Sequence, residues 1–222
     1  MRRTLQTMHQ EHADPEAFTI RLLGWFEQHG REFPWRQTDN PYRVLICEVL
    51  LRRSRSTTVA KVTDPFFERW PDPRALAQAD ADEVIEVIRP LGLTSRAGQL
   101  IALAQALSNG TAFPSSVDQL VALPGVGRYS AAATLGEPTV DGTSARVYRR
   151  YFGQLDAQEH KTVDDELWEL AADVLPADAD VSRVVNWAVL DLAASTCLPA
   201  QPRCHLCPLA SDCRWRNVDN QP

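Results

Sequence analysis

The sequence has few lysines, no long apolar runs and almost no strand-like alternation of polar and apolar residues. Only Lys61 and Lys161 are lysines among the 23 basic residues, so any basic surface must be built from arginine. No run of eighteen or more apolar residues occurs, which excludes a predicted membrane-spanning helix. The start, Met1–Gln6, is followed by polar and acidic residues instead of an apolar signal stretch. We therefore expect a cytoplasmic protein that binds no membrane.

The charge balance at first argues against a nucleic-acid partner, because contacts to phosphates need clustered basic residues and the formal net charge is −6. The arginines, however, are clustered locally, and the acidic residues gather elsewhere, in 72–86, 156–169 and 173–180. Local clusters, and not the total, decide what a surface binds. The arginine clusters are Arg52, Arg53 and Arg55; Arg146, Arg149 and Arg150; and Arg203, Arg214 and Arg216.

Helical patterns cover most of the chain. Asp14-Pro15 predicts a helix start, followed by an inward face that includes Phe18 and Leu22. Ser116 and Gln119 predict a capping box that opens a short helix. With 44% apolar residues in 222, a sizeable core is expected, and the fold class is all-α. Further helices are predicted at about 42–53, 57–69, 80–89, 95–109, 127–135, 143–152, 161–175 and 180–195.

A glycine-containing turn, Leu123-Pro124-Gly125-Val126-Gly127-Arg128, lies between two predicted helices at about 116–135. Its two glycines allow a tight reversal and let a phosphate approach the free N–H groups that start the second helix. The helix dipole and Arg128 would both favour an anion there. A plain turn between packed helices is the alternative, but the full six-residue pattern favours the anion site.

Four of the five cysteines lie within the last twenty-six residues, separated by six, two and five residues: Cys197, Cys204, Cys207 and Cys213. In a reducing compartment such crowding favours a metal site over disulfides. The loop 197–213 can wrap one metal centre. Zinc is one alternative, although four-cysteine zinc sites usually pair two Cys-x2-Cys knuckles and this loop has one. Cys47, on an apolar predicted helix, is interpreted as a small buried hydrophobe.

Two carboxylates have settings that can support catalysis. Asp141 directly precedes a predicted helix, so from its neighbours alone an N-cap is the favoured interpretation. Glu48 is a single acidic residue inside an apolar helix, where burial would raise its pKa and suit a proton donor. A satisfied core pair is the alternative for Glu48.

Taken in order from Phe18 to Cys213, these motifs resemble the helix-hairpin-helix DNA glycosylases that carry an iron-sulfur cluster. The group includes endonuclease III and adenine-DNA glycosylase relatives, and the archaeal thymine/uracil mismatch glycosylases are the most similar. The resemblance implies two helical domains: a six-helix domain at 40–140 and a cluster domain from 1–39 and 141–222. It also implies that Cys197, Cys204, Cys207 and Cys213 hold a structural 4Fe-4S cluster.

The resemblance also assigns catalytic residues. Hydrolysis of an N-glycosidic bond builds positive charge on the sugar, which a carboxylate stabilises, and an acid helps the base to leave. Asp141, followed by Arg146-Val147, matches the family's essential aspartate, and Glu48 matches its glutamate. Tyr129 stands where endonuclease III relatives have lysine and adenine glycosylases have serine, and thymine-mismatch glycosylases have tyrosine there. Without that amine, the enzyme is expected to be monofunctional.

The expected partner is double-stranded DNA with a mismatched or damaged base, bound by a nucleoid-associated monomer. In the similar glycosylases the segment after the Glu48 helix enters the duplex as the base is extruded. For Trp35 and Tyr42 a core position is an equal alternative. The residues predicted to contact DNA are Gly125, Val126, Gly127, Arg128, Trp35, Arg36, Leu51, Arg52, Arg53 and Arg146.

One interval departs from the family. The segment from Tyr129 to Asp141 is shorter than the family norm by about six residues, roughly a turn and a half of helix. The second hairpin helix is therefore expected to end at Gly136, with either a displaced Asp141 or a site reshaped for another substrate. The favoured substrate is thymine or uracil opposite guanine. Alternatives are adenine opposite oxidised guanine, an altered base preference, or a non-catalytic iron-sulfur DNA-binding module.

Overall fold

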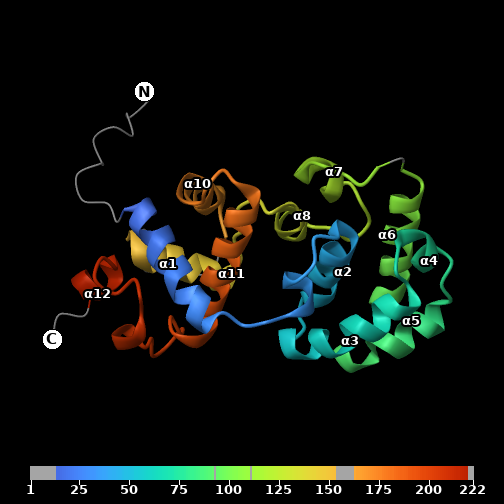
Figure 1. The fold of residues 1–222 in the computed structure, drawn as a ribbon, viewed down its shortest axis with the longest axis horizontal. Helices are drawn as coiled ribbons and strands as arrows, with labels where there is room; N and C mark the ends of the chain where they lie inside the picture. The colour runs from blue at the N-terminus through green and yellow to red at the C-terminus, as the bar shows by residue number, and fades with distance from the viewer. Residues whose placement is uncertain (1–13, 93, 111, 154–162, 220–222) are drawn as a thin grey trace. The chain divides into compact units, whose positions relative to one another are not determined.

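The computed structural model describes residues 14–92, 94–110, 112–153 and 163–219. Within these ranges the regular structure is helical, with no strand, and the all-α prediction is confirmed (Figure 1). None of the described helices is long and apolar enough to cross a membrane. The helices are α1 (Pro15–His29), α2 (Pro41–Leu51), α3 (Ser56–Arg69), α4 (Pro73–Ala77), α5 (Ala81–Ile88), α6 (Arg96–Ser108), α7 (Val117–Val121), α8 (Arg128–Leu135), α9 (Gly142–Phe152), α10 (Asp165–Val174), α11 (Ala179–Ser195) and α12 (Arg214–Asp219), with 3-10 turns η2 (Pro34–Arg36), η3 (Arg89–Leu91) and η4 (Cys204–Leu206).

The helix starts predicted from local sequence signals mostly lie within two residues of the observed starts. Asp14 caps α1 by accepting a hydrogen bond from the Glu16 N–H, as its Asp-Pro pair predicts. The capping box at Ser116 is only half correct. Ser116 accepts from the Gln119 N–H, but the Gln119 side chain accepts from Ser115 instead of Ser116. The short helices α4 and α12 were not predicted, and the expected start of α10, at 161–162, lies outside the described residues.

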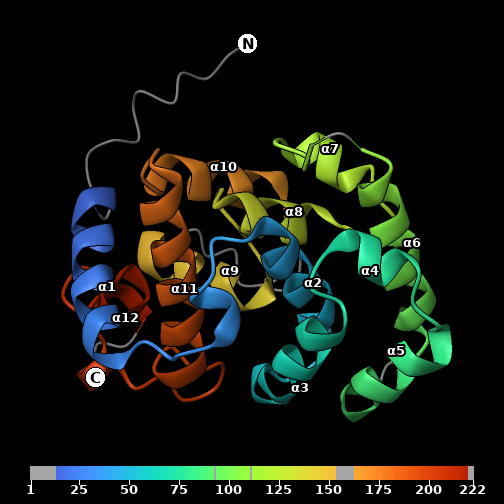
Figure 2. The same ribbon diagram turned by 45° about the vertical axis from the view of Figure 1, so that its right-hand side comes forward.

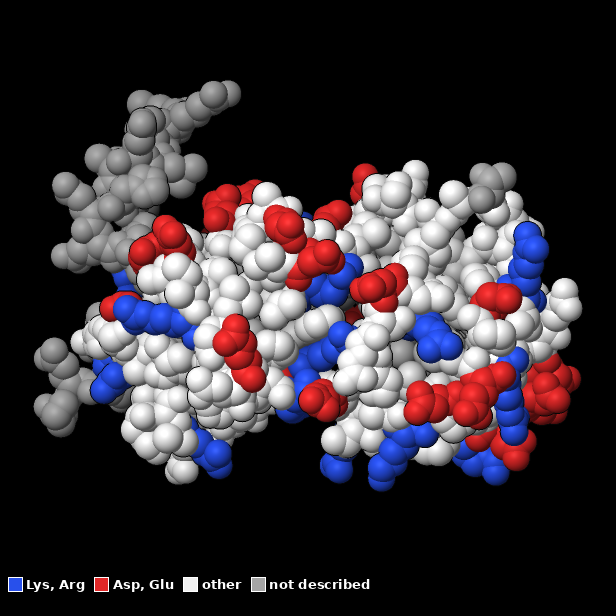
Figure 3. All heavy atoms as spheres, viewed as in Figure 1, with Lys and Arg blue, Asp and Glu red and all other residues white. Residues whose placement is uncertain are grey.

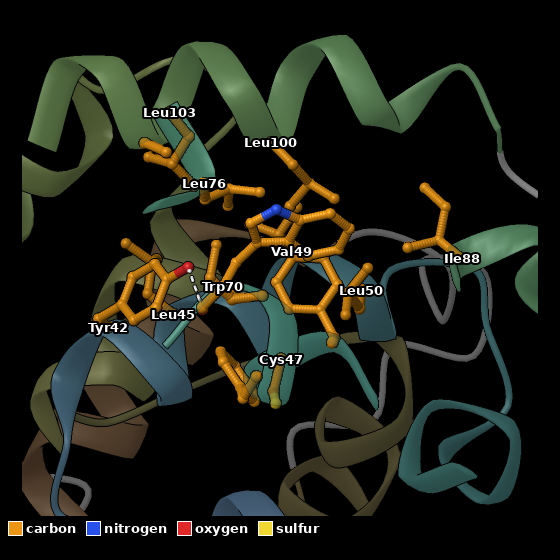
Figure 4. Close-up of a cluster of buried hydrophobic side chains, with 14 of the residues drawn as sticks. Tyr42, Leu45, Cys47, Val49, Leu50, Trp70, Leu76, Ile88, Leu100 and Leu103 are labelled. Carbon is orange, nitrogen blue, oxygen red and sulfur yellow. Dashed lines mark hydrogen bonds between the residues drawn. The ribbon is translucent and has the colours of Figure 1, made fainter. Parts of the chain in front are cut away.

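The chain divides into two compact units, one formed by Glu32–Leu135 and the other by the described parts of 1–31 and 136–222. In the first unit, α2 is buried along most of its length. The Tyr42 hydroxyl at its start donates to the Trp70 carbonyl oxygen at 3.2 Å, and Leu45 and Leu50 lie in the same cluster of buried side chains (Figure 4). This buried helix carries Glu48 and leads directly into the arginine cluster at 52–55.

The second unit is built around α1, α9, α10 and α11. Figures 1 and 2 both show α1 beside α11. Phe18 of α1 is fully buried, with its ring centroid 4.9 Å from that of Tyr151 and 5.9 Å from that of Tyr148, both on α9. This apolar packing holds α9, the helix that follows Asp141, in the core that the unit shares with α1.

The early helix end that the short interval predicts is confirmed. Helix α8 stops at Leu135, and Gly136 follows in the left-handed region with φ +76°. A Cβ atom at this position would lie 2.5 Å from the carbonyl oxygen of Ala179. Only glycine combines this backbone conformation with so close an approach.

We therefore expect Gly136→Ala to lower the free energy of unfolding by about 1–3 kcal/mol, through backbone strain and the contact with Ala179. Denaturant unfolding measures the change. Gly24→Ala is the matched control, because a Cβ at Gly24, on the exposed face of α1, meets no atom within 4 Å. The control is expected to gain up to about 1 kcal/mol from helix propensity. Equal stability of Gly136→Ala and wild type would contradict the strained turn.

Candidate active site and nucleic-acid interface

Glu48 and Tyr129 lie on two helices that pack together within the unit 32–135. Glu48 is 8% exposed on α2, between the buried side chains of Cys47 and Val49. Tyr129 is half-buried in the first turn of α8.

Burial raises the pKa of the Cys47 thiol to about 12, with a smaller contribution from Glu48, so Cys47 is the inert buried residue that its context predicts.

The turn between α7 and α8 is tight and partly solvent-exposed. The Val126 N–H donates to the Leu123 carbonyl oxygen at 3.3 Å, and the Val126 side chain is buried. Gly125 has φ +77°, whereas Gly127 and Arg128 are exposed and a Cβ at Gly127 would meet no atom within 4 Å. The start of α8 therefore carries an exposed glycine and an exposed arginine, the combination that the hairpin pattern predicts for an anion site.

A second exposed basic turn follows α2. Arg53 is the only described non-glycine residue with a positive φ, at 58°, and the Ser54 N–H donates to the Leu51 carbonyl oxygen to close the turn. Arg52 and Arg53 are exposed and Leu51 is half-buried. The Arg52 guanidinium donates to the Gly125 carbonyl oxygen at 2.8 Å, which links this turn to the hairpin. A left-handed arginine is energetically costly and is typical of a functional turn.

Arg96, which sequence reasoning missed, fastens the end of α2. From the first residue of α6 its guanidinium donates to the carbonyl oxygens of Val49 and Leu50 at 3.1 and 2.9 Å, and also to that of Arg52. Burial, and then the charges of Arg52 and Arg53, lower the pKa of Arg96. One guanidinium thus satisfies the last carbonyls of the Glu48 helix and holds the basic turn.

We expect Arg96→Met to lower the free energy of unfolding by about 1–3 kcal/mol, because buried carbonyls lose their donor. It should also weaken binding to duplex DNA, since the turn after α2 is released. Thermal unfolding and a DNA titration measure the two effects. Arg74→Met, at an exposed position on α4, removes the same charge without these bonds and serves as the control. Equal DNA affinity of the two variants would contradict a role for Arg96 in the interface.

Acidic side chains gather on one helix of the unit 32–135. Asp82, Glu83 and Glu86 are exposed on α5, and Figure 3 shows acidic side chains gathered where α5 lies. The two exposed turns described above carry arginine instead of acidic residues. The net charge of −6 is thus compatible with a basic contact surface on the same unit.

Asp141 belongs to the other unit and caps α9. Its Oδ1 atom accepts hydrogen bonds from the backbone N–H groups of Thr143 and Ser144, at 2.8 and 2.7 Å, and from the Ser144 hydroxyl. Ser144 Oγ in turn accepts from the Asp141 N–H at 2.9 Å, which completes a capping box. The N-cap interpretation is confirmed, and it is compatible with catalysis. These bonds fix one carboxylate oxygen, and among the described residues none donates to Oδ2.

Arg146 is half-buried and bonded within its own unit. Its guanidinium donates to the carbonyl oxygens of Cys197 and Ala193, at 2.8 and 3.0 Å. Arg150 acts similarly, donating to the Leu198 and Pro199 carbonyl oxygens. Arg150 and Arg146, the latter also a predicted DNA contact, therefore attach α9 to the cysteine loop, whereas Arg149 pairs with Asp164.

The four clustered cysteines line one small cavity together with Arg150 and Trp215. The Arg150 guanidinium lies 4.6 Å from the Trp215 ring centroid and 3.4 Å from the Cys197 sulfur. Burial, and then the neighbouring cysteine sulfurs, raise the pKa of Cys207 to about 12, so a metal would have to displace its proton. Among the described residues, no three His, Cys, Asp or Glu side chains converge closely enough for one metal ion.

Trp35 and Tyr42, for which the sequence left a core position as an equal alternative, both lie in the core. Trp35 is 5% exposed, with its ring stacked 4.6 Å from that of Phe33, and Tyr42 is 3% exposed. A base cannot stack on Trp35 in this arrangement, so the predicted DNA contact is not supported there. Arg36 is half-buried, with its guanidinium 5.1 Å from the Phe33 ring centroid.

A family model described as HhH-GPD superfamily base excision DNA repair protein matches residues 46–173, which include Glu48, Tyr129 and Asp141. The chain belongs to this family. The HhH-GPD chain is 37% identical to the thymine-DNA glycosylase of Aeropyrum pernix, over 92% of its own length and 96% of that relative. It is 34% identical to the thymine/uracil-DNA glycosylase of Pyrobaculum aerophilum, over 90% and 91% of the two chains.

Solved structures agree with this membership. A structure described as that of a thermostable thymine-DNA glycosylase superimposes with a TM-score of 0.82 and 32% identity, over 91% of this HhH-GPD chain and 96% of that one. A protein named adenine DNA glycosylase, from Mycolicibacterium smegmatis, is 32% identical over 90% of this chain but 69% of its own length. The HhH-GPD chain thus spans nearly all of its thymine-acting relatives and a smaller share of the adenine-acting one.

Proposed function

We propose that this protein is a monofunctional DNA glycosylase that removes thymine or uracil mispaired with guanine from double-stranded DNA and acts as a monomer. The observation that carries the proposal is 37% identity to a thymine-DNA glycosylase over nearly the full length of both chains. Tyr129, at the start of α8, agrees with it, because the resemblance gives tyrosine to the thymine-mismatch group at this place. The two exposed basic turns supply contacts to DNA phosphates.

Each catalytic residue has a stated part in the reaction. Water forms a bond to C1′ of the deoxyribose as the bond from C1′ to the base nitrogen breaks, and the base leaves with a proton. The Asp141 carboxylate stabilises the positive charge that builds on the sugar, with its Oδ1 atom held by the start of α9. Glu48 serves as the proton donor or orients water at the base. Tyr129 offers no amine, so no Schiff base forms there.

We also propose that the cysteine loop holds a 4Fe-4S cluster. Four thiols around one cavity supply the donor set that such a cluster requires, and their spacing, with a single Cys-x2-Cys, is unlike the paired knuckles of four-cysteine zinc sites. Cys197, Cys204, Cys207 and Cys213 would be the ligands, and Arg150 would donate to the Cys197 sulfur. When bound, the cluster would cross-link the loop 197–213, which Arg146 and Arg150 attach to α9.

The purified protein is expected to contain about four irons and four acid-labile sulfides per chain, as a single cubane cluster requires. Cys204→Ser should lower both counts and destabilise the loop, because one ligand is lost. Cys47→Ser, which changes a buried cysteine of the other unit, is the control and should leave both counts unchanged. One zinc per chain with no sulfide would contradict the cluster.

The proposed activity is tested on four labelled duplexes that contain a G:T, a G:U, an A:oxidised-guanine or an undamaged pair. The products are analysed with and without hot alkali. Strand breaks that appear only after alkali, and only with G:T and G:U, are expected. Cleavage of only the A:oxidised-guanine duplex would make the protein an adenine glycosylase. No break in any duplex, from iron-loaded protein, would favour the non-catalytic DNA-binding module.

A further inference from the structure

The six-residue segment 136–141 between α8 and α9 is held by a side chain from α11. Asn186, on α11, accepts a hydrogen bond from the Thr139 N–H at Oδ1, at 3.2 Å, and its Nδ2 atom donates to the Glu137 carbonyl oxygen at 2.9 Å. Its side chain is 6% exposed. One buried side-chain amide therefore bonds to two backbone groups of the segment, an N–H and a carbonyl oxygen. These groups belong to residues two positions apart, just before Asp141.

The same segment is restrained on each side of these bonds. At its start, Gly136 lies against the Ala179 carbonyl oxygen at the beginning of α11. At its end, Thr139 and Val140 are 2% and 3% exposed, and Asp141 is locked to α9 by its capping box. Since consecutive extended residues face opposite ways, a slip of one residue would turn the Asp141 side chain away and break both bonds to Asn186.

We propose that Asn186 is the positioning residue for Asp141. It replaces, through one side chain, the turn and a half of helix that this chain lacks between Tyr129 and Asp141. The inference rests on the proposed function, because it assumes that the Asp141 carboxylate acts on the sugar. Asparagine suits the place because its amide offers one donor and one acceptor on a short side chain, whereas aspartate keeps only acceptors and leucine offers neither.

The expected effect concerns the chemical step more than binding. Asn186→Leu keeps the volume but removes both bonds, so we expect the single-turnover rate of base excision at saturating enzyme to fall by about 10- to 100-fold, the range for a small displacement of a catalytic group. Asn186→Asp keeps the acceptor for the Thr139 N–H, so its single-turnover rate should fall less. The affinity of both variants for a duplex with an abasic-site analogue should stay within about twofold of wild type, since the exposed basic turns lie on other elements.

Val185→Ala is the matched control for stability. Val185 is the preceding residue on α11, is fully buried, and belongs to the hydrophobic core of the same unit. Its truncation lowers the melting temperature through a cavity but leaves both hydrogen bonds from Asn186 to the segment in place. At a temperature where both variants are folded, the rate of Val185→Ala should match wild type within about twofold, while that of Asn186→Leu should not.

The outcomes separate this inference from the proposed function. Inactive wild-type protein on every duplex would overturn the function on which it rests. Active wild type with an unchanged rate in Asn186→Leu, or with equal rate losses in Asn186→Leu and Val185→Ala, would overturn the role of Asn186 and leave the function intact. A large loss of rate in Asn186→Leu alone, with retained DNA affinity, is the supporting result.

Discussion

Asp141→Asn is expected to lower the single-turnover rate of base excision by at least about 100-fold, while the fold and the affinity for DNA are kept. The size follows from the loss of a preorganised charge beside the developing positive charge of the sugar. The fold should survive because asparagine is as good an N-cap as aspartate, so the bonds from Thr143 and Ser144 to Oδ1 can be kept. Quench-flow or manual time courses on a G:U duplex measure the rate.

Asp178→Asn is the matched control for this experiment. Asp178 caps α11 in the same way, accepting from the N–H groups of Asp180 and Val181 at 3.0 Å. The Asp178→Asn substitution removes one carboxylate from a helix start in the same unit. It should leave the rate of base excision within about twofold of wild type. A comparable loss of rate in both variants would mean that Asp141 matters only as a cap.

Tyr129→Lys is expected to give the enzyme a strand-cleaving activity that the wild type lacks. A lysine amine at the start of α8 can attack C1′ of the sugar to form a Schiff base, after which β-elimination breaks the strand on the 3′ side. Gel analysis without alkali should show this break, and borohydride should trap a covalent protein–DNA adduct. The wild-type protein should show neither product.

Tyr129→Phe is the control for the change of side chain at this position. It supplies no amine, so its products should remain dependent on alkali for strand cleavage. Trapping of wild-type protein by borohydride would show that another amine of the chain forms the Schiff base. That result would contradict the monofunctional assignment and the part given to Tyr129.

The parts of the site that follow from neighbouring residues were predictable from sequence. The Asp141 cap depends on contacts within three residues, and the turn before α8 depends on Gly125, whose φ is positive. The end of α8 at Leu135 followed from Gly136 and the short interval behind it. Such local features are fixed by backbone geometry and hydrogen bonds that a short stretch of chain contains.

The supports that hold these residues could not be read from short stretches. Asn186 reaches a segment 47 residues earlier, and Arg96 reaches the end of α2 from 46 residues away. Only the packing of helices brings them there. The signals in the sequence were weak: a single amide on the buried face of a predicted helix, and an arginine at a helix start. The bonds of Arg146 were missed for the same reason, since its acceptors lie on α11 and the cysteine loop.

The most direct test of the account is a mass analysis of the products from a G:U duplex incubated with iron-loaded protein. We expect free uracil and a full-length strand that carries one abasic site, with the guanine strand unchanged. Free uracil with a cleaved strand would contradict the monofunctional chemistry. No uracil released from this duplex, and no thymine from its G:T counterpart, would contradict the proposed mismatch glycosylase itself.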